Sequence, residues 1–401
     1  MSAAKFIRIV ALCIGLTLTF TACSGTPQGS GTPAESNTTD PSPLPTAPES
    51  PSPSPSDEPL AVTPDPSTVK EIATGLDAPW SITFVGTSTL ISERDTGKII
   101  EGTVDGKVRV AGVVPGVHHG GEGGLLGIVT RPQTPDTGVK SAGNISAELF
   151  VYSTGTSGNR IQRFELSGQP GALSLGQGTT LVDQIPAAGN HNGGRLAFGP
   201  DSMLYATTGD AGQGQSAQDL DSLAGKILRM TPNGEVPTDN PFPGSLVFSY
   251  GHRNPQGLSW APDGTMFASE FGQNTWDELN IIRAGSNYGW PIVEGITGSD
   301  QFVDPVQQWD PSQASPSGMA QTGNTLFIAN LRGQTLRAVH LATLDQETSF
   351  FSSEYGRIRD VVAAPDGLLW FLTNNTDGRG APNDGDDKLI SVELTPISPP
   401  L

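Results

Sequence analysis

The sequence predicts an all-β fold, a six-bladed β-propeller of four-stranded antiparallel sheets. A segment that reads as a β-hairpin recurs along the chain, and the 401 residues include 50 glycines and 34 prolines. No stretch shows the long amphipathic pattern of a helix. Radially repeated antiparallel sheets suit this pattern, whereas a parallel barrel requires helices between its strands.

Three copies of the hairpin are clearest, at residues 196–209, 258–270 and 361–373. Each is an apolar run, a Pro-Asp turn and a second run with an aromatic residue at a matched position. Proline at the second turn position, followed by Asp, favours a tight reversal. Weaker copies lie at residues 80–92, with Val85-Gly86 at the turn, and at residues 319–329. A sixth is expected over residues 125–153, its turn lengthened by a polar insert at residues 131–147.

The N-terminus has the pattern of an export signal. Lys5 and Arg8 precede an apolar run at residues 9–20, and small residues lead to Cys23. The run is short for a membrane span. We therefore expect a lipoprotein signal peptide at residues 1–22, with Cys23 lipidated and the protein held on the outer side of the cell membrane. An ordinary signal peptide cleaved nearby is the alternative.

Residues 23–67 are rich in Pro, Ser and Thr, so we expect a disordered tether before a propeller domain at residues 68–401. Only Cys13 and Cys23 are cysteines, so this domain has no disulfide. The net charge of the whole chain is −19. Removal of residues 1–22 takes away Lys5 and Arg8, and the remaining 20 basic and 41 acidic side chains give −21. This balance argues against nucleic acid as a partner and is compatible with Ca²⁺ binding.

Several loops place histidine or arginine beside glycine, directly before an expected hairpin. His191 lies in Asn190-His-Asn-Gly-Gly-Arg195, and Arg253 lies in Gly251-His-Arg-Asn-Pro-Gln-Gly257. A histidine held this way can act as a base near neutral pH, and an arginine can stabilise negative charge. Either residue could instead be structural, His191 as a hydrogen-bonded loop residue and Arg253 as the partner of a carboxylate between blades.

Other polar clusters leave more than one interpretation open. Arg359-Asp360 could form a local salt bridge, and Asp277-Glu278 could solvate a loop or support a metal ion. Residues 384–387, Asp-Gly-Asp-Asp, could hold a Ca²⁺ or form a solvated turn. The adjacent pair His118-His119 is not expected to bind a metal, because neighbouring side chains rarely point at one ion.

The ordered set of motifs resembles the soluble pyrroloquinoline quinone (PQQ)-dependent sugar dehydrogenases, the glucose/sorbosone and aldose sugar dehydrogenase family. The resemblance covers residues 72–393, and the family is a six-bladed propeller. It is carried by five motifs: His191-x-x-Gly-Arg-Leu, Gly251-His-Arg-Asn-Pro-Gln-Gly, Glu270-x-Gly-x-Asn-x-x-Asp-Glu-x-Asn, Asn287-Tyr-Gly-Trp-Pro and Arg357-x-Arg-Asp.

The resemblance implies oxidation of aldose sugars at C1 to lactones, with PQQ and Ca²⁺ as cofactors and an external electron acceptor. It implies that His191 is the general base and that Arg253 and Asn254 lie beside the quinone. Backbone carbonyls of Gly272 and Gln273 would bind Ca²⁺. The remaining cofactor contacts would come from Glu122, Arg332, Arg357 and Arg359.

The sequence departs from the glucose-oxidising members at several positions. Glu122 stands where glutamine is typical, Gln273 replaces a proline, and Arg332 replaces a lysine. The loops before Asp219 and after Gly295 are short, which favours a broad aldose specificity. Two other functions remain open, a calcium-dependent propeller lactonase and a non-catalytic envelope propeller that binds sugar or protein.

Overall fold

The computed structural model describes residues 59–102, 106–132 and 144–397. The predicted signal peptide, Cys23 and the predicted tether up to residue 58 lie outside these residues, as does most of the polar insert. In the described part of the chain no helix is long and apolar enough to cross a membrane.

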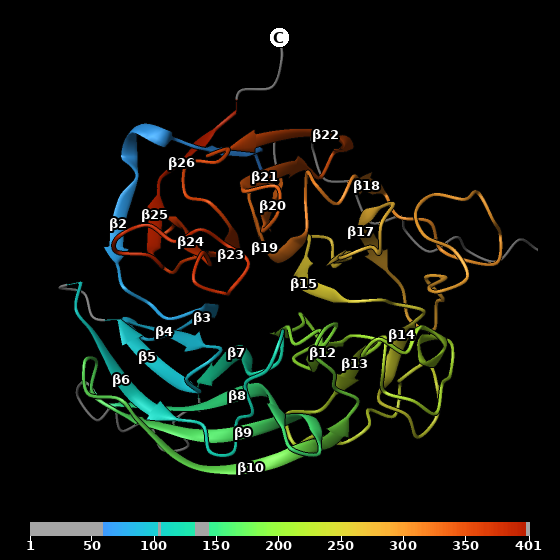
Figure 1. Cartoon of the computed structure of the whole chain (residues 1–401), viewed down its shortest axis with the longest axis horizontal. Helices are drawn as coiled ribbons and strands as arrows, with labels where there is room; N and C mark the ends of the chain where they lie inside the picture. Colours follow the sequence, from blue (N-terminus) through green and yellow to red (C-terminus); the bar gives the residue numbers. More distant parts are fainter. Residues whose placement is uncertain (1–58, 103–105, 133–143, 398–401) are drawn as a thin grey trace, which may run out of the picture. The chain divides into compact units, whose positions relative to one another are not determined.

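The predicted fold is confirmed, because six four-stranded antiparallel sheets form the blades of a propeller (Figure 1). In five blades the strands follow chain order. These blades are β3 (Pro79–Val85), β4 (Ser88–Glu93), β5 (Lys98–Gly102) and β6 (Val108–Val113); β7 (Leu125–Pro132), β8 (Ile145–Gly155), β9 (Gly158–Gly168) and β10 (Ser174–Ile185); β11 (Leu196–Phe198), β12 (Leu204–Thr208), β13 (Lys226–Met230) and β14 (Val247–Tyr250); β15 (Pro255–Trp260), β16 (Met266–Glu270), β17 (Asp277–Ile282) and β18 (Gln307–Trp309); and β19 (Pro316–Thr322), β20 (Thr325–Asn330), β21 (Thr335–His340) and β22 (Thr343–Phe350).

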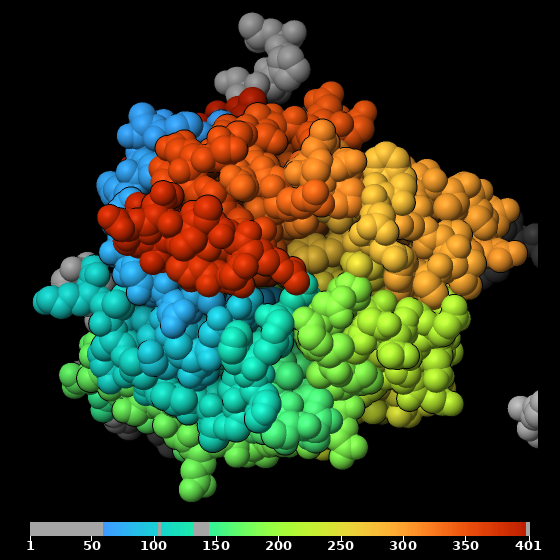
Figure 2. Space-filling view, viewed as in Figure 1, coloured from blue at the N-terminus to red at the C-terminus, as the bar shows by residue number. Residues whose placement is uncertain are grey.

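The sixth blade joins the two ends of the domain. It combines β23 (Ile358–Ala363), β24 (Leu369–Thr373) and β25 (Leu389–Val392) with β2 (Lys70–Ala73) from the start of the chain. The N-terminal and C-terminal segments accordingly lie side by side in Figure 2. The two ends of the domain thus close the ring within one sheet, with β2 as the outer strand of that blade.

The predicted tether boundary at residue 67 differs from the structure. β1 (Val62–Pro64) pairs with β26 (Leu394–Pro396), and a 3-10 turn at Pro66–Thr68 follows. The ordered chain therefore starts before residue 68. The only other 3-10 segment in the described chain is Gly214–Ala217.

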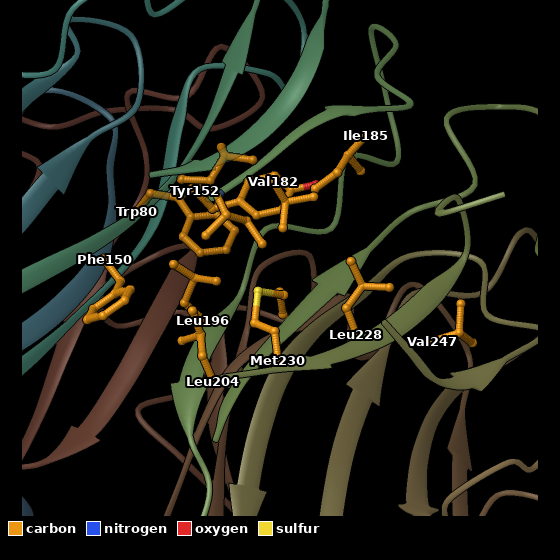
Figure 3. Packing of buried hydrophobic residues seen from close by; sticks show 13 residues of the cluster. Trp80, Phe150, Tyr152, Val182, Ile185, Leu196, Leu204, Leu228, Met230 and Val247 are labelled. Atoms are coloured by element: carbon orange, nitrogen blue, oxygen red, sulfur yellow. The ribbon is translucent and has the colours of Figure 1, made fainter. Parts of the chain in front are cut away.

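Apolar side chains between adjacent blades hold the ring together. One cluster joins Phe150 and Tyr152 of β8 to Leu204 of β12 and Leu228 of β13 (Figure 3). All four side chains are fully buried. Such burial stabilises each pair of blades, and it leaves the loops at the ends of the strands free to carry polar residues.

The first strand of each blade lies next to the first strand of the following blade, all the way around the ring. The predicted hairpin turns, such as the one between β3 and β4, therefore lie at one end of the ring. At the other end lie two sets of loops, those that lead into a first strand and those that join the second and third strands of a blade. Most of the motifs singled out in the sequence lie in these two sets of loops. The Asn287-Tyr-Gly-Trp-Pro motif lies instead in the long β17–β18 loop, from which Trp290 reaches Asp210.

Candidate active site

A cavity of about 150 Å³ lies at the end of the ring where the first strands begin. Five arginines and two carboxylates contribute to its wall. The lining residues are Trp80, Arg94, Glu122, Gln256, Phe271, Ser315, Leu331, Arg332, Arg357, Arg359, Asp377 and Arg379. The structure thus brings together four residues that were predicted to contact the cofactor, Glu122, Arg332, Arg357 and Arg359.

His191 lies beside this cavity and is held at three points. Its Nδ1 is 2.7 Å from Asp210 Oδ1, and its Nε2 is 3.2 Å from Asn190 Nδ2. Its backbone N–H donates to Glu122 Oε2 at 2.8 Å, and its φ of 56° is left-handed. Because Asp210 accepts at Nδ1, the imidazole presents an unprotonated Nε2 when it is neutral. That nitrogen can accept a proton.

Asp210 is buried and follows β12, at the start of the loop that ends at β13. Its Oδ1 also accepts the Gly212 N–H at 2.7 Å, and its Oδ2 accepts the Trp290 Nε1–H at 2.8 Å. Burial works to raise the pKa of Asp210, but His191 and these two donors outweigh burial and hold the pKa below its usual range. Asp210 therefore stays ionised beside the imidazole.

Arg253 follows β14 and contacts Phe271, which lines the cavity. Its Nη1 donates to the Phe271 carbonyl at 3.2 Å, and its guanidinium carbon lies 5.4 Å from the centre of the Trp290 ring. Burial lowers the pKa of Arg253, although nearby carboxylates oppose this. No carboxylate forms a salt bridge with it in the described chain, so the inter-blade ion pair considered from the sequence is wrong. Its buried Nε has no hydrogen-bond partner among the described residues.

Asn254 is fully buried next to Arg253. Its Oδ1 accepts the Gly193 N–H at 2.9 Å, two residues after His191, while its Nδ2 has no partner among the described residues. Buried donors without a partner are rare in proteins. Together with Arg253 Nε, this amide suggests a polar ligand at the site.

Two of the cavity arginines share Asp377. Arg357 donates to Asp377 Oδ2 through Nε and Nη2, at 3.2 and 2.9 Å. Arg359 lies 3.7 Å from the same oxygen and donates to Asn374 Oδ1 and Gln256 Oε1. Burial lowers the pKa of Arg359 to about 9. The two cations outweigh the effect of burial on Asp377 and hold the pKa of that carboxyl below its usual range.

The local salt bridge between Arg359 and Asp360 is absent. Asp360 Oδ2 instead pairs with Arg195 at 3.0 Å and accepts the Ile82 N–H at 2.9 Å. Neighbouring residues of a strand point to opposite faces, and both lie in β23, so each meets a different set of partners.

Arg332 is an exposed cation of the wall and makes no hydrogen bond or ion pair with the described residues. It lies in the short segment between β20 and β21. A guanidinium of this kind is available to an anionic ligand.

Gly272 and Gln273 lie in the loop between β16 and β17. Their carbonyl oxygens accept no hydrogen bond from the described residues, whereas their N–H groups bind Asp277 Oδ1 and Glu294 Oε1 at 2.8 and 2.6 Å. Glu294 Oε1 also accepts from the N–H groups of residues 274–276 at 3.2–3.3 Å. One carboxylate oxygen thus accepts hydrogen bonds from four consecutive N–H groups of this loop and fixes its backbone.

Asp277 is buried, so the solvated-loop interpretation is wrong for this residue. Burial raises its pKa to about 6 and that of Glu278 to about 7. No group of three or more His, Cys, Asp or Glu side chains placed to hold a metal ion occurs in the described residues. In the acidic run near residue 387, Asp387 accepts from Thr373, Asn375 and Thr376.

The sequence analysis gave no role to several residues of this site. Asp210 binds His191, Trp290 donates to Asp210, Asp377 orders the arginines, Glu294 holds the 272–276 loop, and Arg94 and Arg379 line the cavity. The available sequence signals were the motif that contains Trp290 and the glycines next to Asp210 and Asp377. Their partners come from other loops or blades.

Comparison with known proteins agrees with this geometry. Residues 76–382 match the family described as glucose/sorbosone dehydrogenase. The chain belongs to this family. An aldose sugar dehydrogenase of Escherichia coli is 31% identical over 362 residues, covering 80% of this chain and 93% of the relative. Quinoprotein glucose dehydrogenase B of Acinetobacter calcoaceticus is 27% identical over 409 residues, covering 74% and 82%.

Solved structures of similar proteins give the same result. The PQQ-bound form of aldose sugar dehydrogenase from Streptomyces coelicolor is 44% identical, with a TM-score of 0.76, and covers 84% of this chain and 100% of that chain. This glucose/sorbosone dehydrogenase family member is therefore similar in sequence to a quinoprotein glucose dehydrogenase, and similar in sequence and fold to a PQQ-bound aldose sugar dehydrogenase.

Proposed function

We propose that the protein is a quinoprotein dehydrogenase that uses PQQ and Ca²⁺ to oxidise aldose sugars at C1 to lactones. The observation that carries this proposal is the arginine-lined cavity directly beside the His191–Asp210 pair. The similarity to the PQQ-bound Streptomyces enzyme supports it.

The residues of the cavity fit PQQ, a planar quinone with several carboxylates. Arg332, Arg357 and Arg359 would bind the carboxylates, since guanidinium groups pair with carboxylates through forked donors. Arg253 and Asn254, each with a buried donor that lacks a partner, would bind the quinone oxygens. Glu122 would contact the cofactor from the loop between β6 and β7. When bound, the cofactor accepts the hydride that leaves C1 of the sugar.

His191 is the general base in this proposal. Its Nε2 takes the proton of the anomeric hydroxyl, displacing the Asn190 amide that now lies 3.2 Å away. Asp210 fixes the Nδ1–H tautomer and stabilises the imidazolium that forms. The left-handed backbone of His191, held by Glu122, sets the direction of the ring.

Arg253 stabilises negative charge next to the base. Its guanidinium is fixed by the Phe271 carbonyl and the Trp290 ring, so little reorganisation is needed when charge develops. The same Trp290 donates to Asp210, which couples the position of Arg253 to that of His191.

Ca²⁺ fits the loop between β16 and β17 because the carbonyls of Gly272 and Gln273 accept no other hydrogen bond in the described chain. Oxygen ligands suit this hard cation, and Ca²⁺ held by these carbonyls would supply a Lewis acid for the cofactor. A calcium-dependent lactonase would rely instead on a group of carboxylate ligands, and the described residues contain none.

The wider setting follows from the sequence. Lipidation at Cys23 would hold the enzyme at the outer side of the cell membrane, where an external acceptor would take the electrons. Broad aldose specificity is the expected substrate range, as the short loops before Asp219 and after Gly295 favour.

The test is reconstitution of the purified protein with PQQ and Ca²⁺, followed by dye reduction with a panel of aldoses. We expect turnover only when both additions are present. His191→Ala should bind PQQ nearly as well as the wild type and show no turnover. Failure of the wild type to bind PQQ at micromolar concentration would reject the proposal, and lactones would be tested next.

A further inference from the structure

Arg379 is, like Arg94, a cavity arginine that neither the motifs nor the family resemblance pointed to. It lies in the loop between β24 and β25, and Asp377 shapes the turn that presents it. Asp377 Oδ1 accepts the N–H groups of Arg379 and Gly380 at 2.8 and 3.2 Å. The other oxygen of Asp377 binds Arg357, so the same carboxylate places two cations in the wall.

Arg379 crosses the cavity mouth to Glu122. Its Nη1 lies 2.8 Å from Glu122 Oε1, and 57% of its side chain is exposed. Glu122 belongs to the loop before β7, so the ion pair joins loops of two blades. The second oxygen of Glu122 accepts the His191 N–H at 2.8 Å. Glu122 therefore has one oxygen on the base and one on Arg379.

A carboxylate in this position is unfavourable for the ligand that the cavity fits. An anionic ligand with several carboxylates would lie close to the Glu122 charge, and like charges at short range repel each other. A glutamine, the residue typical of the glucose-oxidising members, would bring no such charge. Glu122 needs a dedicated cation, and Arg379 is the residue that the structure places on it.

We propose that Arg379 is a further cofactor-binding residue, and that its main role is to neutralise Glu122 so that the polycarboxylate cofactor can bind beside it. This inference rests on the proposed function. Glu122 and Arg379 form a matched pair, in which Glu122 holds the backbone of His191 and Arg379 cancels the charge that this contact brings into the cavity.

A double-mutant cycle on cofactor affinity tests the proposal. The dissociation constant of PQQ is measured by isothermal titration calorimetry, in the presence of Ca²⁺, for the wild type, Glu122→Gln, Arg379→Gln and the double variant. We expect Arg379→Gln alone to weaken binding by about tenfold or more, because Glu122 is left uncompensated. In the Glu122→Gln background the same change should have an effect of less than about threefold. Arg379→Lys, which keeps the charge, should restore most of the affinity.

Two controls separate this role from a structural one. Arg131→Gln removes a similarly exposed cation at the far end of β7, where Arg131 Nη1 lies 3.8 Å from Glu148, and should leave PQQ affinity unchanged. Glu148→Gln removes the carboxylate that Arg131 shares with Arg163, at 3.4 Å, and should also leave it unchanged. Melting temperatures of all variants identify any that fail to fold.

Equal effects of Arg379→Gln in both backgrounds, with the wild type binding PQQ, would overturn the neutralisation of Glu122 by Arg379 and leave the proposed function intact. A wild type that binds no PQQ would overturn both.

Discussion

Replacing Asp210 by Asn probes the base with almost no change of shape. The carboxylate accepts three hydrogen bonds, from His191 Nδ1 at 2.7 Å, Gly212 N at 2.7 Å and Trp290 Nε1 at 2.8 Å. The side-chain amide of Asn has one acceptor oxygen and one NH₂ group. Its NH₂ group must therefore replace one of the two carboxylate oxygens and face a donor that it cannot bind. If the amide oxygen faces His191, the Trp290 bond is lost. If it faces Trp290, the Gly212 bond is lost and His191 is forced into the tautomer that carries its proton on Nε2.

Either arrangement loses one hydrogen bond that a half-buried or exposed N–H now donates to a charged carboxylate, which lowers the unfolding free energy by about 1–3 kcal/mol. Both also remove the negative charge that stabilises the imidazolium. We therefore expect kcat for aldose oxidation to fall by about 10²–10⁴-fold, with PQQ affinity nearly unchanged. The assays are dye reduction at saturating PQQ, Ca²⁺ and sugar, and urea unfolding.

Asp201→Asn is the matched control. Asp201 also binds several donors, Tyr205 and Arg229 among them, but it lies in the β11–β12 turn at the other end of the ring. It should lose stability and keep kcat. An Asp210→Asn enzyme within about threefold of the wild-type kcat would refute the assignment of His191 as a base oriented by Asp210.

The pH dependence of stability has a defined sign. The folded-state pKa of Asp210 lies below its usual value, so its stabilising contribution is present above the unfolded pKa of about 3.9 and is lost as the pH falls. The difference in unfolding free energy between wild type and Asp210→Asn should therefore shrink as the pH falls below about 4. A difference that grows on acidification would contradict the direction of this pKa shift.

Three further substitutions test other parts of the site. Lys226→Met removes a buried ammonium that donates to the carbonyls of Ser216, Ala217 and Ala224. It should lower the unfolding free energy, measured by urea titration, by about 1–3 kcal/mol. Unchanged stability would mean that these bonds do not hold the 209–225 loop. Glu294→Ala frees the N–H groups of residues 273–276, most of them exposed, so calorimetry should show Ca²⁺ affinity reduced at least about tenfold with a melting temperature close to wild type; an unchanged affinity would separate this loop from the metal. Arg357→Gln leaves Asp377 with the more distant Arg359 and should weaken PQQ binding by about 10–100-fold, whereas a similar binding constant would remove Arg357 from the cofactor site.

The fold could be predicted from the sequence because each hairpin is marked by a pattern within a short stretch of the chain. Two apolar runs separated by a turn define each hairpin, and three of the turns are Pro-Asp. All six expected hairpins appear as the first two strands of a blade. The pairing of β1 with β26 was not accessible, because Val62 and Pro396 lie at opposite ends of the chain. No local pattern in a segment rich in proline indicates that partner.

The site was accessible in part for the same reason. The motifs that contain His191, Arg253, Arg357 and Arg359 stand next to expected strands, so their convergence at one end of a propeller could be predicted. Asp210 lies 19 residues from His191, and only the path of the β12–β13 loop brings their side chains to 2.7 Å.

Arg359 and Asp360 show the opposite error. Neighbours in sequence suggested a pair, but the alternation of side chains along β23 directs Asp360 to Arg195 instead.

The most direct test of the central claim is a single-turnover measurement. Wild-type protein is loaded with one equivalent of PQQ in the presence of Ca²⁺ and mixed anaerobically with an aldose, while the absorbance of the bound cofactor is followed. The account predicts stoichiometric reduction of the cofactor by the sugar in the wild type, and binding without reduction in His191→Ala. A complex that forms but is not reduced by any aldose, or that is reduced equally fast without His191, would contradict it.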